Sequence, residues 1–341
     1  MDPVLASLKR KREAFVEEMT PPNTKAAVAY GLKQYDDFCE ANSLQHVAYH
    51  PEVLGAAMLA RFDDGAAENT IRGMRSAVAG RYAAHEQNPA EFQEIVALMK
   101  KIEKNTPPPK AYEEVEAQLF LRLLALIDVH VEARVRMGES LQALRASRDR
   151  LLFTTIFNTW QRPKSMVDLY TSDVQLRQGP PEALTMSFVG HREDNTKGPK
   201  NHQGGKHECV VGKASTAALD LVEYWQRFHA LEWVVLQERG ITSNPPKHVF
   251  YNMVDHADHF GKKLSASTPN SCFKKWMGML LPPDVAKKYS LYSVKFGGYT
   301  AARRAGVSAE ARKKHGGWKS DAHRGYNVIN DEEMLAITQG L

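Results

Sequence analysis

The chain has 341 residues, of which 43% are hydrophobic and 25% are charged, and this composition is typical of a soluble globular protein. Its length predicts two domains of unequal size. No apolar run approaches the roughly 20 residues that span a bilayer, and the N-terminus lacks the layout of a signal peptide, so we expect no membrane partner. Cys39, Cys209 and Cys272 are far apart in the sequence, which suits free thiols in a reducing compartment and gives no metal-binding spacing.

Basic charge is concentrated toward the C-terminal end of the chain. The formal net charge is +5, which alone says little about a partner. Between Leu291 and Tyr326, however, eight basic residues stand against two acidic ones, a local net charge of +6. The basic residues are Lys295, Arg303, Arg304, Arg312, Lys313, Lys314, Lys319 and Arg324. A local field of this size attracts phosphate groups and favours a nucleic-acid partner.

The first hundred residues predict a short leader followed by a bundle of helices. In the leader, residues 1–20, the run Lys9-Arg10-Lys11-Arg12 is either a nuclear localisation signal or the solvated start of a helix. We base an expected location in the nucleus on this run, with the nucleoid or cytoplasm as the alternative for a prokaryotic or viral protein. Residues 21–104 are expected to form the bundle, because apolar residues recur there at steps of three and four. Its helices are predicted from Thr24 onward and over about 51–62, 69–85 and 89–101.

The third of these helices carries a row of arginines. Arg72, Arg75 and Arg81 face away from its apolar stripe, behind an Asn69-Thr70 start. Arginines on one face, beside small residues, are able to lie against a DNA backbone or groove. A solvated polar face explains the pattern about equally well. These five residues are therefore candidate DNA contacts.

Three consecutive prolines mark the boundary between the two domains. Pro107-Pro108-Pro109, within the predicted linker 105–112, have no amide donors and favour an extended spacer. We expect a second domain over 113–330 and a tail over 331–341, so that the fold class is mainly α with a small antiparallel β-sheet. Helices are predicted over about 113–128, 139–159, 216–239, 268–281, 293–305, 308–315 and 319–328, and strands over 184–189, 207–211 and 249–251.

Two positions early in the second domain suit chemistry on a phosphate group. Arg162 follows the predicted helix 139–159, and a guanidinium can hold two phosphate oxygens at once. An arginine that merely ends a helix at the surface is the alternative. Lys197, with Lys200 as the reserve candidate, lies in a loop rich in Gly, Pro and Lys between two predicted strands. A lysine in a mobile turn can act as a general acid, although an exposed hairpin lysine is common.

The C-terminal part of the domain supplies further candidates. A phenol close to cations can be stabilised as phenolate and can attack phosphorus, which makes Tyr326 a candidate nucleophile. Trp318 lies eight residues earlier, and its indole N–H can donate a hydrogen bond to a phosphate oxygen. Packing of both aromatic side chains is the competing explanation. Tyr292 and Lys295 stand about one helical turn apart further upstream.

Taken in order, these motifs resemble those of the tyrosine recombinases, the family of phage integrases and mobile-element recombinases. As in that family, an Asp-Val dipeptide at Asp173 begins eleven residues after Arg162, and Gly306 lies eleven residues after Lys295. Trp318 follows Gly306 by twelve residues, where the family has a His or a Trp. The short step from this tryptophan to the tyrosine is similar to that of eukaryotic mobile-element recombinases.

The resemblance covers about 113–330, and the bundle before it is similar to the family's core-binding domain. It implies that Tyr326 attacks a phosphodiester, forms a 3′-phosphotyrosyl bond and releases a 5′-hydroxyl. It further implies that the phosphate is held by Arg162, Lys295, Tyr292 and Trp318, with Lys197 as general acid. Tyr292 and Lys295 occupy the family's His-x-x-Arg box. The lysine keeps the charge of that arginine without its planar grip.

The resemblance also implies the partners. Double-stranded DNA would be clamped by both domains, with Lys200 and Lys319 as further contacts, by a homodimer or tetramer in which the tail 331–341 docks on a neighbour. The reaction would need no cofactor and no metal. Three other functions stay open: a DNA-binding protein derived from a recombinase that no longer cuts, a type IB topoisomerase-like relaxing enzyme, and a helical protein-interaction module.

Overall fold

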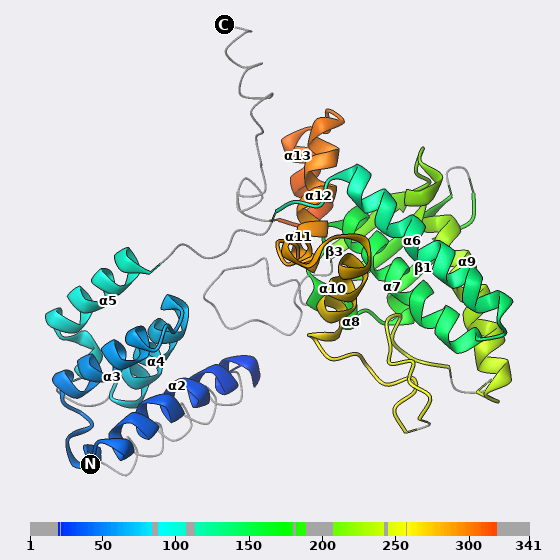
Figure 1. Cartoon of the computed structure of the whole chain (residues 1–341). Helices are drawn as coiled ribbons and strands as arrows, with labels where there is room; N and C mark the ends of the chain where they lie inside the picture. The colour runs from blue at the N-terminus through cyan, green and yellow to red at the C-terminus, as the bar shows by residue number, and fades with distance from the viewer. Residues whose placement is uncertain are drawn as a thin grey trace, which may run out of the picture. The chain divides into compact units, whose positions relative to one another are not determined.

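The structure is a computed structural model that describes residue 20 and the ranges 22–83, 88–106, 113–179, 182–188, 207–241, 245–256 and 258–318. The chain divides into two compact units, Met1–Ala111 and Tyr112–Leu341, and each is considered by itself (Figure 1). The predicted fold class is confirmed, since these ranges are mostly helical with one small antiparallel sheet. Within the same ranges, no helix combines the length and the apolar character that crossing a membrane requires.

The first unit is a bundle of helices around a small apolar core. Tyr35, Met58 and Ile71 are fully buried and join α2, α3 and α4. Gly31 lets α2 approach α4 closely, because a Cβ at this position would lie 3.0 Å from the Cβ of Ala77. The elements are α2 (Pro22–Ala41), η1 (Gln45–Val47), α3 (Pro51–Asp63), α4 (Glu68–Arg81), η2 (Pro89–Glu91) and α5 (Gln93–Asn105).

Two predicted helix boundaries in this unit are wrong. The helix predicted over 69–85 ends at Arg81, because Tyr82 (φ −99°, ψ 12°) leaves the helical conformation. The helix predicted from Pro89 begins only at Gln93. Pro89–Glu91 forms a separate 3-10 turn, and Phe92 after it is extended (φ −61°, ψ 140°). Propensity alone does not locate such ends, which depend on local capping.

The second unit is organised around α7, against which α6, α9 and α12 pack (Figure 1). Its strands β1 (Val174–Arg177), β2 (Ala183–Phe188) and β3 (His207–Gly212) pair antiparallel in the order β1-β2-β3. Its longer helices are α6 (Ala117–Arg136), α7 (Ser140–Thr159), α9 (Leu221–Glu238), α10 (Thr268–Leu280), α12 (Leu291–Arg304) and α13 (Ala309–Gly316). Short elements are α8 (Pro163–Val167), α11 (Pro283–Ala286), η3 (Thr171–Asp173) and η4 (Ala217–Leu219).

Polar side chains of α7 are buried and paired. Arg148 is 6% exposed and contacts Asp149 at 2.7 Å, and it donates a 3.1 Å hydrogen bond to the Tyr251 carbonyl. The other oxygen of Asp149 accepts from the Trp276 indole at 3.0 Å. Buried charges are tolerated when they are hydrogen-bonded in this way. The network therefore fixes α10 and the loop at Tyr251 against α7.

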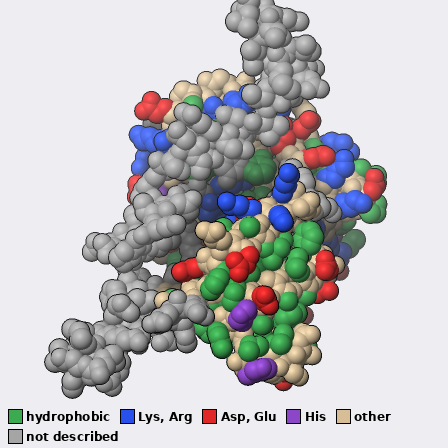
Figure 2. Space-filling view, turned by 90° about the vertical axis from the view of Figure 1, so that its left-hand side faces the viewer, with side chains coloured by type: hydrophobic (Ala, Val, Ile, Leu, Met, Phe, Trp, Pro, Cys, Tyr) green, Lys and Arg blue, Asp and Glu red, His purple; other side chains and the backbone are tan. Residues whose placement is uncertain are grey.

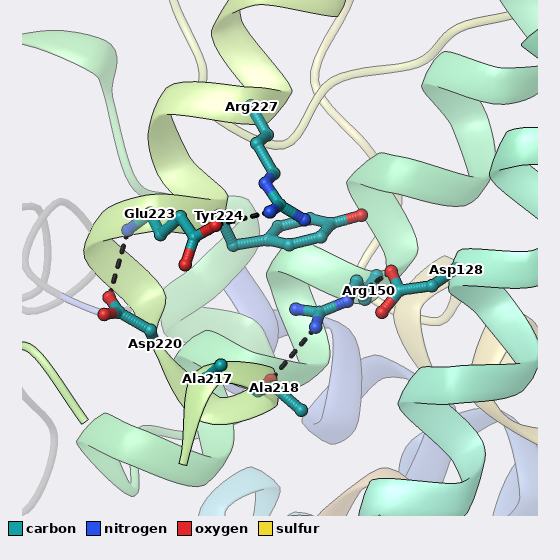
Figure 3. Close-up of a pocket in the computed structure, with 8 residues that line it drawn as sticks. All are labelled: Asp128, Arg150, Ala217, Ala218, Asp220, Glu223, Tyr224 and Arg227. Atoms are coloured by element: carbon teal, nitrogen blue, oxygen red, sulfur yellow. Dashed lines mark hydrogen bonds and ion pairs between the residues drawn. The ribbon is translucent and has the colours of Figure 1, made fainter. Parts of the chain in front are cut away.

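A second polar network lines a pocket of about 210 Å³ between α6, α7 and α9 (Figure 3). The Arg150 side chain is 3% exposed and lies 2.7 Å from Asp128. Its guanidinium also donates to the Ala218 carbonyl at 3.0 Å and covers the Tyr224 ring at 3.7 Å. Burial raises the pKa of the Asp128 carboxyl, although Arg150 partly opposes the shift. These mutual contacts account for the charges that line the pocket, and they join three helices.

The structure corrects several predicted elements of this unit. The strand predicted at 249–251 does not form, and the segment makes only isolated bridges, such as the one between Tyr251 and Lys263. The strand β1 was not predicted, because its alternation of apolar and polar residues extends over only four positions. The helix predicted over 216–239 is divided at Asp220, which caps α9 by accepting from the Glu223 amide. The helix predicted over 113–128 begins at Ala117 and continues to Arg136.

Two adjacent glycines set the position of α12. A Cβ on Gly297 would lie 1.9 Å from the Val115 carbonyl oxygen, and one on Gly298 would lie 2.0 Å from the Phe157 carbonyl oxygen. Real Cβ atoms do not approach so closely, so only glycine allows α12 to touch the last turn of α7. This contact brings α12 next to the turn that follows α7.

Candidate phosphate-binding site

The turn after α7 begins the site. The helix ends at Thr159, and Trp160 adopts the left-handed conformation (φ 54°, ψ 28°), which is uncommon for a residue with a side chain. Arg162 then serves as the N-cap of α8 in an extended conformation, and Pro163 occupies the first helical turn. Proline suits this place because its missing N–H has no helical partner there. The turn is thereby fixed on both sides of Arg162, which is partly buried.

Lys295 lies inside the unit. The helix α12 starts at a capping box in which Ser290 and Ser293 satisfy each other's backbone groups. One half-turn later Lys295 is only 1% exposed, and its Nζ lies 5.0 Å from the centre of the Trp318 ring. A cation over an indole is stabilised by the ring's electron-rich face. Tyr292, one turn earlier, is 43% exposed, so the two members of the predicted box differ in burial.

Trp318 closes the site from the end of α13. Gly317 ends that helix in the left-handed conformation (φ 72°), and a Cβ on Gly316 would lie 1.8 Å from the Trp318 ring. Both glycines are therefore needed to fold the indole back against the helix. The Trp318 ring is 4% exposed and stacks on Trp160, with 6.2 Å between ring centroids, while Tyr299 meets it edge-on at 5.6 Å.

A further cation borders this aromatic cluster. The Arg312 guanidinium lies 4.6 Å from the centre of the Tyr299 ring, and its Nε donates to the Val307 carbonyl at 3.1 Å. Burial raises the pKa of the Tyr299 hydroxyl, which therefore stays protonated at neutral pH. The cluster thus combines neutral aromatic walls with positive side chains, an arrangement that suits an anion.

The structure brings together three of the predicted site segments. Lys295 contacts Trp318, Trp318 stacks on Trp160, and Trp160 is separated from Arg162 by a single residue. Tyr292 lies on α12 but at its surface. The predicted nucleophile, general acid and remaining DNA contacts lie outside the described residues: Tyr326, Lys197, Lys200 and Lys319.

The candidate DNA contacts of α4 are described and take part in contacts within the first unit. Arg72 pairs with Glu68 and with Glu103, and Arg81 pairs with Asp36. The Arg75 guanidinium donates to the Ala90 carbonyl at 2.6 Å. Asn69 is exposed and Thr70 is partly buried at the start of the helix. The role of these residues toward DNA stays a prediction.

Among the described residues that Figure 2 leaves uncovered, lysine, arginine and acidic side chains are exposed together with hydrophobic ones. Among the described residues, no three His, Cys, Asp or Glu side chains are arranged to hold a metal ion. This includes the loop at Asp255 and His256, whose side chains are largely exposed.

Sequence reasoning missed two residues of the site, His207 and His315. His207 at the start of β3 donates through Nε2 to the His315 carbonyl at 2.9 Å. The His315 ring donates through Nε2 to the Asn158 carbonyl at 2.7 Å, and it lies 4.5 Å from the Trp160 ring. No spacing in the sequence links positions so far apart. Cys209 beside them is buried in the apolar core.

Solved structures resemble this chain in fold. No protein-family model matches the sequence, and no curated protein matches it in sequence. The XerH site-specific recombinase in a post-cleavage complex with palindromic difH is 15% identical, with a TM-score of 0.58 over 92% of this chain and 78% of that one. A lambda integrase dimer on a COC′ core site is 12% identical, with a TM-score of 0.52 over 95% and 79% of the two chains.

The Tn1549 transposon integrase in complex with transposon right-end DNA is a third match. It is 12% identical, with a TM-score of 0.53 over 94% of each chain. The three proteins are recombinases or integrases, and the alignments extend over nearly all of this chain. The chain therefore has the tyrosine recombinase fold.

Proposed function

We propose that this protein breaks and rejoins DNA as a tyrosine recombinase or integrase. The observation that carries the proposal is the burial of Lys295 against Trp318, which stacks beside the turn that bears Arg162. A cation beside an indole and next to an arginine-bearing turn gives the site a positive local field, which suits an anion. XerH is bound to its difH substrate and the Tn1549 integrase to transposon DNA in their complexes, which supports a phosphodiester as that anion.

The proposed reaction is a transesterification. The Tyr326 oxygen forms a bond to phosphorus while the bond from phosphorus to the 5′ oxygen breaks, and the phenol gives its proton to water. Lys197 gives a proton to the leaving 5′ oxygen. The 3′-phosphotyrosyl bond conserves the energy of the phosphodiester, so a 5′-hydroxyl can later attack it and reseal the strand. The cations stabilise the charge that develops on phosphorus in both steps.

Covalent trapping on a nicked suicide substrate tests this function. Wild-type protein should form a protein–DNA adduct that survives denaturation, and Tyr326→Phe should form none. Tyr49→Phe, which changes an exposed tyrosine of the first unit, is the matched control and should leave the adduct unchanged. Absence of an adduct from wild-type protein, on DNA that it demonstrably binds, would overturn the proposal.

A DNA-binding protein derived from a recombinase is the second candidate. It is favoured by the exposure of Tyr292 and by the lysine at position 295, since neither reproduces a histidine that shuttles protons or an arginine that grips two oxygens. This function predicts DNA affinity that falls with salt and no adduct on any bound target. Supercoil relaxation without recombinant products would instead indicate a topoisomerase-like enzyme, and lack of DNA affinity at low salt a protein-interaction module.

We further propose that the active form is a homodimer or tetramer on double-stranded DNA, because exchange of strands needs two cleaved duplexes held together. Light scattering of the protein with and without its DNA measures this directly. A location in the nucleus, based on Lys9-Arg10-Lys11-Arg12, is checked by imaging the tagged chain with these four residues changed to alanine.

A further inference from the structure

A pair of histidines joins three segments that border the candidate site. His207 Nε2 donates to the His315 carbonyl at 2.9 Å, which ties the start of β3 to the last turn of α13. His315 Nε2 lies 2.7 Å from the Asn158 carbonyl, which ties the same turn to the end of α7. We call these two hydrogen bonds the histidine link. The residues that it joins are 108 and 157 positions apart in the sequence.

The geometry of the link assigns a single tautomer to His315. A backbone carbonyl only accepts, so Nε2 must carry the proton that it shares with Asn158. Nδ1 is then the unprotonated nitrogen, and the Cys209 sulfur beside the ring lies 3.8 Å from Nδ1 and 3.5 Å from Nε2. Burial raises the pKa of the Cys209 thiol to about 12, so the thiol stays protonated and can donate weakly to Nδ1. These two contacts favour the neutral form of the His315 ring, with its proton on Nε2.

The link acts on the site through the residues that follow and flank it. Trp318 is three residues beyond His315, and the Trp160 ring lies 4.5 Å from the His315 ring. Gly317 stands between His315 and Trp318 in the chain and packs directly on the His207 ring. A Cβ on Gly317 would lie only 2.8 Å from that ring. The end of α13 therefore has little freedom to move while both hydrogen bonds are made.

We infer that His315 is a positioning residue, which in its neutral form holds Trp318 over Lys295 and releases it on protonation. This inference rests on the proposed function for its effect on catalysis. A protonated ring would bring a new N–H close to the Cys209 sulfur, a weak acceptor, and would place a cation near His207. His207 keeps its donor in either charge state, so its bond to the His315 carbonyl does not switch.

The sign of the pH effect follows from the surroundings of the ring. The elements packed around His315 carry several ionisable groups: His207, Glu208 and Cys209 on β3, Glu310, Arg312, Lys313 and Lys314 on its own helix, and Lys295, Arg303 and Arg304 on α12. Burial lowers the pKa of His315, the hydrogen bond to Asn158 opposes the shift, and His207 adds to it. The stabilising effect of the neutral ring is therefore complete above about pH 6.5 and declines as the pH falls below that value.

Nuclear magnetic resonance of the full chain tests the link without relying on activity. In wild-type protein, His315 should titrate below its ordinary pKa as the Nε2–H tautomer, and the Trp318 indole resonance should shift with the same midpoint. His315→Gln keeps an N–H donor for the Asn158 carbonyl but does not titrate, so the Trp318 shift should disappear. His256→Gln, in an exposed loop, is the matched control. A Trp318 shift that persists unchanged in His315→Gln overturns the inference.

Adduct formation on the suicide substrate supplies the catalytic readout. The single-turnover rate of wild-type protein should fall about tenfold per pH unit below the His315 midpoint, as expected for one essential deprotonated group. His315→Gln should show a flat profile over the same range, and His315→Leu a rate about tenfold lower at pH 7.5. If wild-type protein forms no adduct, the proposed function fails while the resonance titration still decides the inference. Should His315→Gln not fold, the wild-type titration decides the inference by itself, because a Trp318 shift whose midpoint differs from that of His315 would overturn it.

Discussion

The arginines of α4 and the lysine of α12 carry the same charge but are placed in opposite ways. Arg72 and Arg81 lie at the surface of the first unit, with side chains 47% and 32% exposed, and both pair with carboxylates. Lys295 is 1% exposed and lies over the Trp318 ring. Surface ion pairs contribute about 0–1 kcal/mol, whereas moving a charge into the interior costs several kcal/mol that its surroundings must offset. The comparison teaches that burial, not charge, distinguishes the candidate site.

Removal of the buried charge should have the largest effect. Lys295→Met keeps the length of the side chain but removes the cation that would face the phosphate, so adduct formation should fall by about 100- to 1000-fold. The measurement is the single-turnover rate on the suicide substrate, together with the DNA dissociation constant. Lys274→Met, at an exposed position of α10, should leave the rate within about twofold of wild type. If the single-turnover rate fell equally in both variants, the effect would not depend on the buried position of Lys295.

The contact that brings α12 to the site should be the next most sensitive feature. Gly298→Ala forces a Cβ to within 2.0 Å of the Phe157 carbonyl, and the strain should lower the free energy of unfolding by about 3 kcal/mol or more. Urea unfolding followed by circular dichroism measures the change. Gly278→Ala in α10, which has open space around it, should instead be neutral or stabilising by up to about 1 kcal/mol. Similar stabilities for the two variants would contradict the close approach of α12.

Loss of a partly buried partner should have an intermediate effect. Asp128→Asn leaves the Arg150 guanidinium, 3% exposed, without its carboxylate. Because Asp128 is itself 36% exposed, the cost should be about 1–2 kcal/mol rather than that of a fully buried pair. The free energy of unfolding in urea checks this. No change in stability would mean that water replaces the carboxylate fully, and that the pocket in Figure 3 is not part of what joins the helices.

The surface arginines should show the smallest effects. The hydrogen bond from Arg81 lowers the pKa of Asp36, so the pair stabilises the protein above the ordinary aspartate pKa and is lost as the pH falls through the lowered value. Arg81→Gln should therefore reduce stability by less than about 1 kcal/mol at pH 7, and by less in acid. Thermal unfolding at pH 7 and pH 3 measures both values.

The same arginines provide the test of the predicted DNA contacts. If Arg72 and Arg81 leave their carboxylates to meet phosphates, each substitution by Gln should reduce the slope of log K against log salt by about 1. If they stay paired within the unit, the slope should not change. Filter binding over a range of salt concentrations separates these outcomes, with Arg136→Gln, an exposed residue of α6, as the control.

Much of the fold followed from local sequence signals. The apolar periodicity predicted the helices of the first unit, and the two strands β2 and β3 were found on either side of a loop rich in glycine and lysine. The errors arose where tertiary contacts overrode local preference. The segment at Val249 is apolar like a strand, but it is buried in the core and makes only isolated bridges. The end of α4 was placed four residues too late because nothing in its periodicity marks Tyr82 as the cap.

The candidate site likewise has a part that the sequence predicted and a part that it did not. Ordered motifs singled out Arg162, Lys295 and Trp318, and the structure brings the segments that carry them together. The histidine link could not be predicted, because it depends on which carbonyl faces which ring after folding. A histidine in the sequence gives no indication of this, and its two partners lie on α7 and β3.

The sequence by itself determined the helical character of the chain and the order of the residues that suit phosphate chemistry, and its proline run predicted a division into two domains. Such features depend on neighbours within a few positions, so periodicity and spacing reveal them. Only the tertiary structure decided that Lys295 is buried beneath Trp318 while Arg72 and Arg81 pair at the surface. Burial and pairing join residues far apart in the chain, and they are set by the packing of helices, which Gly297 and Gly298 permit only because they lack side chains.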